Sequence, residues 1–191
     1  MPPIRSFIAI ELPRETRDCL ERVTNRLKAS AVDVRWVRTN DIHLTLKFLG
    51  DVEEQRIPEI AGCIERCLEG ISPFSITVRD LGAFPGDHNP QVIWIAAADE
   101  SDRLSIVQGS LEDGLSRIGF KKENRPYFPH LTLGRLKSPR GKETVRRGLA
   151  EFKNTDCGSY TAGAVSLIKS ELKPSGAVYT LLQSFSLHTH S

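Results

Sequence analysis

Residues 43–50 read HLTLKFLG and residues 130–135 read HLTLGR, so the tetrapeptide His-Leu-Thr-Leu occurs twice. Two of the five histidines, His43 and His130, open these copies and stand 87 residues apart. The runs Ile-Ala-Ile at 8–10 and Ile-Trp-Ile at 93–95 are separated by nearly the same distance, so the spacing extends beyond the motif. The sequence therefore indicates an internal duplication, with too few copies and too long a period for a solenoid.

The hydrophobic pattern runs through the same order of elements in each half. Apolar runs rich in β-formers predict strands over residues 6–12, 43–52, 74–85, 91–97, 127–136, 164–172 and 178–187. Apolar residues at helical spacing predict helices over residues 13–30, 53–69, 101–118 and 141–151. We expect an α+β, bilobal, duplicated fold in which two antiparallel-rich β-sheets with outer helices surround a central cleft and are related by a pseudo-two-fold axis. Residues 1–191 should form one bilobal domain, with repeat halves of approximately 4–86 and 90–188.

Strand geometry separates the duplicated motif into two faces. Residues two apart point the same way, so His43 and Thr45 share one face, as do His130 and Thr132. The leucines between them, and Phe48, are expected to face a core. A pseudo-two-fold axis would turn the two His-Thr faces toward each other, where one imidazole can donate a proton while the other accepts one. The threonine hydroxyls are suitable donors to phosphate oxygens.

A single histidine on a strand face is more often a structural residue than a catalyst. A matched pair at equivalent places in a duplicated unit favours acid–base catalysis instead. No cluster of Cys, His or acidic residues accompanies the pair, so neither a metal nor another cofactor is expected.

Composition limits the class of protein. The chain has 191 residues, 39% hydrophobic and 26% charged, which is typical of a globular protein and not of a disordered tail. The formal net charge of +2 excludes a bulk polyelectrolyte binder but leaves room for a local basic cleft. We find no apolar run of about twenty residues and no secretory leader, so the expected location is cytoplasmic, without membrane attachment.

Basic residues gather around both copies of the motif. They are a solvated surface or the walls of a site for an anionic ligand, and they comprise Arg35, Arg38, Lys47, Lys121, Lys122, Arg125, Arg135, Lys137 and Arg140. The cysteines fit neither a disulfide framework nor a zinc site, so we expect free thiols at Cys19, Cys63, Cys67 and Cys157.

The chain resembles the two-histidine (2H) phosphoesterases, which carry paired HxTx motifs. Within that family it is similar to the bacterial and archaeal RNA 2',3'-cyclic phosphodiesterases, also called 2'-5' RNA ligases. The resemblance extends over nearly the whole chain through RSFIAIELP, RWVRTNDIHLTLKFLGDV, LGAFP, RPYFPHLTLGR, SLIKSEL and GAVYTLLQSF. It implies a bilobal fold with a central cleft and metal-independent hydrolysis of RNA 2',3'-cyclic phosphate ends to 2'-phosphates, with a reversible 2'-5' ligation as a related activity.

The resemblance also implies roles for individual residues. His43 would donate a proton to the leaving 3'-oxygen and His130 would accept one from water, although the near symmetry of the motifs leaves that order open. Thr45 and Thr132 would hold the phosphate. Relatives carry an arginine five residues after the second histidine, matched here by Arg135. Strand parity places Arg135 on the wrong face unless a bulge at Gly134 or the strand end reverses it, so phosphate binding and a surface role both stay open.

The sequence departs from its relatives just before the second motif. Relatives commonly read Pro-Phe-Arg-Pro-His, whereas residues 126–130 read Pro-Tyr-Phe-Pro-His. Phe128 replaces the arginine, and it either stacks on a base or packs in the core, with packing favoured. Phe7 and Phe48 are also candidates for base stacking.

Three functions remain after these considerations. The leading one is a cyclic phosphodiesterase that acts on RNA ends or cyclic nucleotides, works as a monomer and needs no protein partner. The second keeps the site but changes the substrate to ADP-ribose 1'',2''-cyclic phosphate or a 2'-5' oligonucleotide. The third is an RNA-end binding module that does not turn its ligand over.

Overall fold

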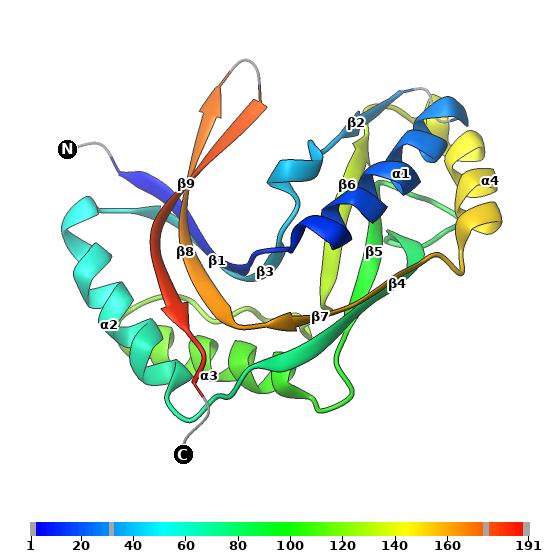
Figure 1. Cartoon of the computed structure of the whole chain (residues 1–191). Helices are drawn as coiled ribbons and strands as arrows, with labels where there is room; N and C mark the ends of the chain where they lie inside the picture. The colour runs from blue at the N-terminus through cyan, green and yellow to red at the C-terminus, as the bar shows by residue number, and fades with distance from the viewer. Residues whose placement is uncertain (1–2, 31–32, 174–175, 189–191) are drawn as a thin grey trace.

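The computed structural model of the chain describes residues 3–30, 33–173 and 176–188 (Figure 1). Its helices are α1 (Arg14–Ser30), α2 (Ile57–Leu68), α3 (Arg103–Arg117) and α4 (Lys142–Phe152). Short 3-10 turns follow as η1 (Thr39–Asp41), η2 (Glu54–Arg56) and η3 (Pro139–Gly141). Its strands are β1 (Ile4–Ile10), β2 (Val34–Trp36), β3 (Leu44–Val52), β4 (Phe74–Phe84), β5 (Val92–Ala98), β6 (His130–Leu136), β7 (Asp156–Ala162), β8 (Ala164–Lys173) and β9 (Gly176–Ser186).

Each predicted helix and strand corresponds to one of these elements, and the α+β class with two antiparallel sheets is confirmed. Two strands were not predicted. β2 has only three residues. β7 reads DCGSYTA and is mostly exposed, so it lacks the apolar alternation that marks a half-buried strand.

The two sheets each take strands from both halves of the chain. One sheet, sheet A, has the order β3-β1-β8-β9, and the other, sheet B, has the order β2-β6-β5-β4-β7. β1 pairs with β3 on one side and with β8 from the C-terminal half on the other. In sheet B, β6 pairs with β2 and β5 pairs with β4, both from the N-terminal half. The halves of the duplication are therefore interwoven, an exchange that the hydrophobic pattern does not reveal.

Each sheet is also covered by one helix from each half of the chain. α1 and α4 pack on the outer side of sheet B, against β7 and β4, while α2 and α3 pack on each other and on β9 and β3 of sheet A. Figure 1 shows the two helix pairs on opposite flanks of the molecule, with the sheets between them. α2 and α3 approach closely at Gly114, where a Cβ atom would lie 2.3 Å from the sulfur of Cys67. Within the described ranges, no helix is long and apolar enough to cross a membrane.

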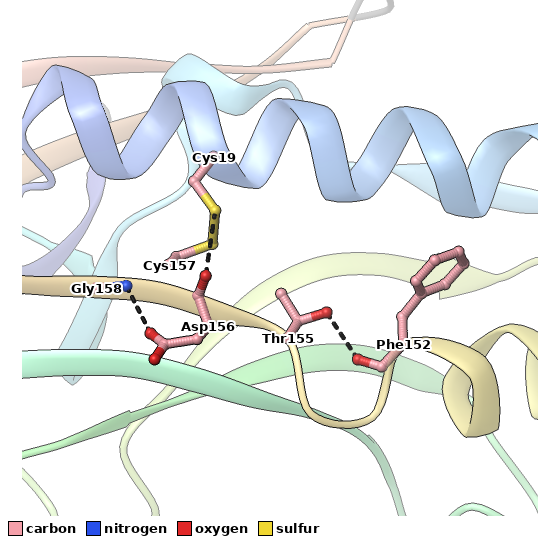
Figure 2. The surroundings of a disulfide bond; sticks show 6 residues. All are labelled: Cys19, Phe152, Thr155, Asp156, Cys157 and Gly158. Carbon is pink, nitrogen blue, oxygen red and sulfur yellow. Dashed lines mark hydrogen bonds between the residues drawn. A yellow bond between two sulfur atoms is a disulfide. The ribbon is translucent and has the colours of Figure 1, made fainter.

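A disulfide corrects the expectation of four free thiols. Cys19 of α1 is bonded to Cys157 of β7, with the two Cα atoms 5.6 Å apart, and Figure 2 shows the bond between helix and strand. The partners are separated by 138 residues, so only the packing of α1 on β7 brings them within bonding reach. Cys63 and Cys67 of α2 are free, as expected.

Candidate functional site

His43 lies immediately before β3 and is partly buried. Its Nδ1 atom is 2.8 Å from the backbone oxygen of Asp41. A carbonyl oxygen can only accept a hydrogen bond, so Nδ1 carries the hydrogen and Nε2 is the nitrogen left to exchange a proton with a ligand. The local turn therefore selects the tautomer of His43.

His130 opens β6 and repeats this arrangement. Its Nδ1 atom is 2.8 Å from the backbone oxygen of Phe128, again two residues earlier in the chain. The two imidazoles are thus held in the same tautomer by the same local geometry, with Nε2 as the reactive nitrogen of each ring.

Aromatic rings pack around both histidines. Phe7 of β1 stacks on His43 with 4.4 Å between ring centroids, and Tyr179 of β9 meets His43 edge-on at 5.2 Å. On the other side of the site, Phe84 of β4 meets His130 edge-on at 5.0 Å. The sequence does not single out Tyr179 or Phe84 as site residues, although both lie within segments that resemble the family.

A β-bulge decides the orientation of Arg135. Trp94 of β5 pairs with Thr132, and the next residue, Ile93, pairs with Gly134, so Leu133 is an additional residue in β6. An extra residue reverses the alternation beyond it, which returns Arg135 to the side of His130 and Thr132. The burial pattern agrees, because Leu133 and Gly134 are both buried and Arg135 is exposed. The sequence leaves open whether a bulge near Gly134 turns Arg135 toward the face of His130, and the structure has that bulge.

An equivalent bulge in β3 overturns the expectation for Phe48. Thr45 pairs with Ala9 and Lys47 pairs with Ile8, so Leu46 is the additional residue. The alternation reverses, Lys47 turns inward, and Phe48 is 67% exposed instead of facing the core. Phe48 stands 87 residues before Arg135, so the duplication places an aromatic ring in one half where the other half has a guanidinium.

The surroundings of the two imidazoles differ in charge. Burial lowers the pKa of His43 below its ordinary value, and the bond to the carbonyl of Asp41 and the carboxylate of Asp41 oppose that decrease. Burial also lowers the pKa of His130, where the positive charge of Arg135 adds to the decrease and only the bond to Phe128 opposes it. The nearby charges thus differ in sign: the carboxylate of Asp41 favours the protonated form of His43, whereas the guanidinium of Arg135 disfavours the protonated form of His130.

A groove of about 960 Å³ connects the two sheets. Thr45 and His130 both line it, so it joins the first HxTx motif to the second. β3 and β6 contact each other, and the hydroxyl of Tyr127 donates a hydrogen bond to the backbone oxygen of Thr45 over 3.2 Å. His43, Thr132 and Arg135 are not among the residues that line this groove.

The three candidates for base stacking, Phe7, Phe48 and Phe128, differ in how much of each ring is exposed. Phe7 is only 3% exposed, so its ring supports His43 and presents little surface to a base. Phe48 is exposed and lines the groove. Phe128 packs edge-on against Phe84 and Trp94 yet stays 45% exposed and also lines the groove, so the favoured prediction of core packing describes only one side of its ring.

The basic residues also take different places. Lys47 is among the residues that line the groove, but its ammonium is buried in an ion pair with Glu112, so its charge is already compensated within the protein. Arg38 donates to the carboxylate of Asp41 and to the backbone oxygen of Ala177 in β9. The groove is lined by Lys121, Lys122 and Arg125, and not by Arg35, Lys137 or Arg140. Across the described parts of the chain, we find no group of three His, Cys, Asp or Glu that could hold a metal ion.

Comparisons with known proteins agree with the duplicated fold. The family model described as LigT-like phosphoesterase matches residues 10–94 and again residues 95–179. The RNA 2',3'-cyclic phosphodiesterase of Methanothermobacter thermautotrophicus is 36% identical over 184 residues, which cover 96% of this chain and 99% of that protein. The protein of the same description from Methanocaldococcus jannaschii is 31% identical over 95% of this chain and all of its own length.

Solved structures agree in fold as well. A crystal structure of a Thermus thermophilus protein is similar with a TM-score of 0.82 and 28% identity, over 96% of this chain and 98% of that one. The apo form of Escherichia coli LigT is similar with a TM-score of 0.78 and 25% identity, over 99% of this chain and all of that one.

Proposed function

The chain belongs to the LigT-like phosphoesterase family, and we propose that it hydrolyses RNA 2',3'-cyclic phosphate ends to 2'-phosphomonoesters. The names of the full-length relatives from two archaea support this substrate. The observation that carries the proposal is the pair of imidazoles, His43 and His130, held in one tautomer in differently charged surroundings.

The different surroundings support an assignment of roles. His130, beside Arg135, is the base: its Nε2 takes a proton from water, and the water oxygen bonds to phosphorus. His43, beside Asp41, is the acid: as the bond from phosphorus to the 3'-oxygen breaks, its Nε2–H gives that oxygen a proton. The product carries a 2'-phosphate and a 3'-hydroxyl, and solvent exchange then resets both rings. The step requires no metal.

The phosphate is held by neighbours of the two histidines. The hydroxyls of Thr45 and Thr132 donate hydrogen bonds to its oxygens, and the guanidinium of Arg135 offsets the negative charge that develops on them. The bulge in β6 supports this role for Arg135, because it places that side chain on the face of His130. A 5'-hydroxyl in the place of water would produce a 2'-5' linkage, so ligation uses the same groups.

The test is hydrolysis of an RNA with a 2',3'-cyclic phosphate end in the presence of EDTA. We expect a product that resists a 3'-phosphatase, because the phosphate stays on the 2'-oxygen. His43→Ala and His130→Ala should each lower kcat roughly 100- to 10,000-fold. The matched control is His88→Ala, since His88 is exposed in the loop between β4 and β5. Turnover within a few-fold of wild type in either active-site variant would contradict the mechanism.

The same assay separates the alternatives. A panel of cyclic nucleotides, 2'-5' dinucleotides and ADP-ribose 1'',2''-cyclic phosphate ranks the substrates, and binding without product would indicate a module that only holds RNA ends. We also propose a monomer, because one chain supplies both histidines. Light scattering after size-exclusion chromatography checks this.

A further inference from the structure

We infer that the groove between His130 and the segment 121–125 binds the nucleotides that precede the cyclic phosphate, so the preferred substrate is an oligonucleotide end and not a single cyclic nucleotide. This inference rests on the proposed function. The cyclic phosphate occupies the terminal ribose, so further nucleotides can extend only on its 5' side. The groove extends from His130 to the segment 121–125, so it can hold these preceding nucleotides.

The size of the groove supports more than one nucleotide. Its volume of about 960 Å³ is near the upper end of the roughly 300–1,000 Å³ that small-molecule pockets span. His130 and Thr45 lie among its lining residues, while Lys121, Asn124 and Arg125 line it in the segment between α3 and β6. A nucleotide bound at the histidines therefore leaves part of the groove for its neighbour.

Two exposed aromatic rings line the groove from different sheets. Phe48 comes from β3 of sheet A and is 67% exposed, and Phe128 precedes β6 of sheet B and is 45% exposed. Stacking on such rings is a common way to hold single-stranded RNA, and it tolerates any base. The exposed ring of Phe48 thus offers a flat apolar face in the groove that a base can cover.

Basic side chains outnumber carboxylates along the groove. Lys121, Lys122 and Arg125 are exposed there, and Lys122 is 2.5 Å from the carboxylate of Asp113. Within the described residues, Lys121 and Arg125 have no carboxylate within ion-pair distance. They can therefore contact backbone phosphates, which supply most of the affinity of nucleic-acid binders.

Hydrogen bonds from β3 and α3 hold the backbone of the segment 121–125 in place. The buried ammonium of Lys47 donates to the backbone oxygen of Lys121 at 2.9 Å and to Glu112 at 2.7 Å. Glu112 accepts a further hydrogen bond from the backbone nitrogen of Glu123 at 3.1 Å. Tyr127 is bonded to the backbone of Thr45 at the other end of the segment. The wall of the groove is therefore tied to β3, the strand that continues from His43.

The experiment compares substrates of increasing length. We expect kcat/KM to rise at least tenfold from a 2',3'-cyclic mononucleotide to a tetranucleotide with the same end. The double variant Lys121→Gln/Arg125→Gln should lower kcat/KM for the tetranucleotide about tenfold and leave the mononucleotide within twofold. Its salt dependence should become shallower by about 0.7 in logarithmic slope for each phosphate that the variant no longer neutralises. Phe48→Ser should lower kcat/KM for the tetranucleotide about 5- to 150-fold, because stacking contributes about 1–3 kcal/mol per base.

A matched control carries the same charge change elsewhere. Lys28→Gln/Lys153→Gln removes two exposed lysines, from the last turn of α1 and the end of α4, and should leave all substrates unaffected. Equal kcat/KM of the wild type for substrates of every length would overturn the inference. So would an equal decrease in kcat/KM for the mononucleotide and the tetranucleotide in Lys121→Gln/Arg125→Gln.

Failure of the proposed function gives a different result. If no substrate is hydrolysed, that function fails, and fluorescence anisotropy with a labelled tetranucleotide bearing a 2'-phosphate then tests the groove. Equal affinity of wild type and Lys121→Gln/Arg125→Gln for this probe would overturn the inference. A weaker affinity in Lys121→Gln/Arg125→Gln, with wild-type affinity in the control Lys28→Gln/Lys153→Gln, would support it.

Discussion

The ammonium of Lys47 on β3 lies 2.7 Å from a carboxylate oxygen of Glu112 on α3, and both side chains are buried. This ion pair joins the strand that begins after His43 to the helix that leads into the segment before His130. Its third partner is the backbone of Lys121, so the charges are hydrogen-bonded as well as paired. We therefore expect it to position the groove wall relative to both HxTx motifs.

Removal of one partner should destabilise the fold strongly. Lys47→Met or Glu112→Gln leaves an uncompensated buried group, and we expect the free energy of unfolding to fall by about 3–5 kcal/mol. The double variant Lys47→Met/Glu112→Met should recover much of that loss, because an apolar pair of similar volume removes both charges. Chemical denaturation measures all three. Single variants within about 1 kcal/mol of wild type would contradict this view of the pair.

The hydroxyl of Tyr127 gives a comparison with a matched control. It donates to the backbone of Thr45, so Tyr127→Phe should cost about 1 kcal/mol of stability and lower kcat more than it changes KM. Tyr160 of β7 has a buried hydroxyl with no partner in the described parts of the chain. Tyr160→Phe should therefore be neutral or stabilising and leave kcat unchanged. Equal effects of the two substitutions on kcat would exclude a positioning role for Tyr127.

The pH dependence of kcat/KM should be bell-shaped. Because burial lowers the pKa of both histidines, we expect the optimum on the acid side of their ordinary value of about 6.5. In the proposed roles, His130 must be neutral and controls the acid limb, while His43 must be protonated and controls the basic limb.

Two substitutions should move these limbs separately. Arg135→Gln removes a positive charge, raises the pKa of His130 and shifts the acid limb to higher pH. Asp41→Asn removes a negative charge, lowers the pKa of His43 and shifts the basic limb to lower pH. NMR titration of the two imidazoles shows which ring responds, which matters because coupled groups share macroscopic values. A shift of the basic limb in Arg135→Gln would reverse the assignment of acid and base.

The disulfide should contribute to stability without affecting the reaction. Cys19→Ser/Cys157→Ser opens a loop of more than a hundred residues, and we expect a loss of about 2–5 kcal/mol in the free energy of unfolding. Neither cysteine lines the groove, so kcat and KM should stay unchanged at temperatures where the variant is folded. Unfolding of wild type with and without a reductant gives an independent measurement. A loss of activity in the folded variant would contradict this separation.

Local patterns were sufficient to predict the helices, most of the strands and the two HxTx motifs. Alternation with a period of two and spacing with a period of 3.6 are properties of neighbouring residues, so they can be read without a partner. The faces of His43 and Thr45 follow from the same rule. β7 has no such pattern because little of it is buried, so it could not be predicted in this way.

The amino-acid sequence alone establishes a duplicated α+β protein with two matching His-Thr pairs. The directions of the Phe48 and Arg135 side chains follow from strand pairing instead, because a bulge is defined by the register with a neighbouring strand. Long-range packing likewise decided that Cys19 meets Cys157 and that Lys47 is buried against Glu112. These contacts depend on the exchange of strands and helices between the two halves, which places residues far apart in the chain on adjoining surfaces.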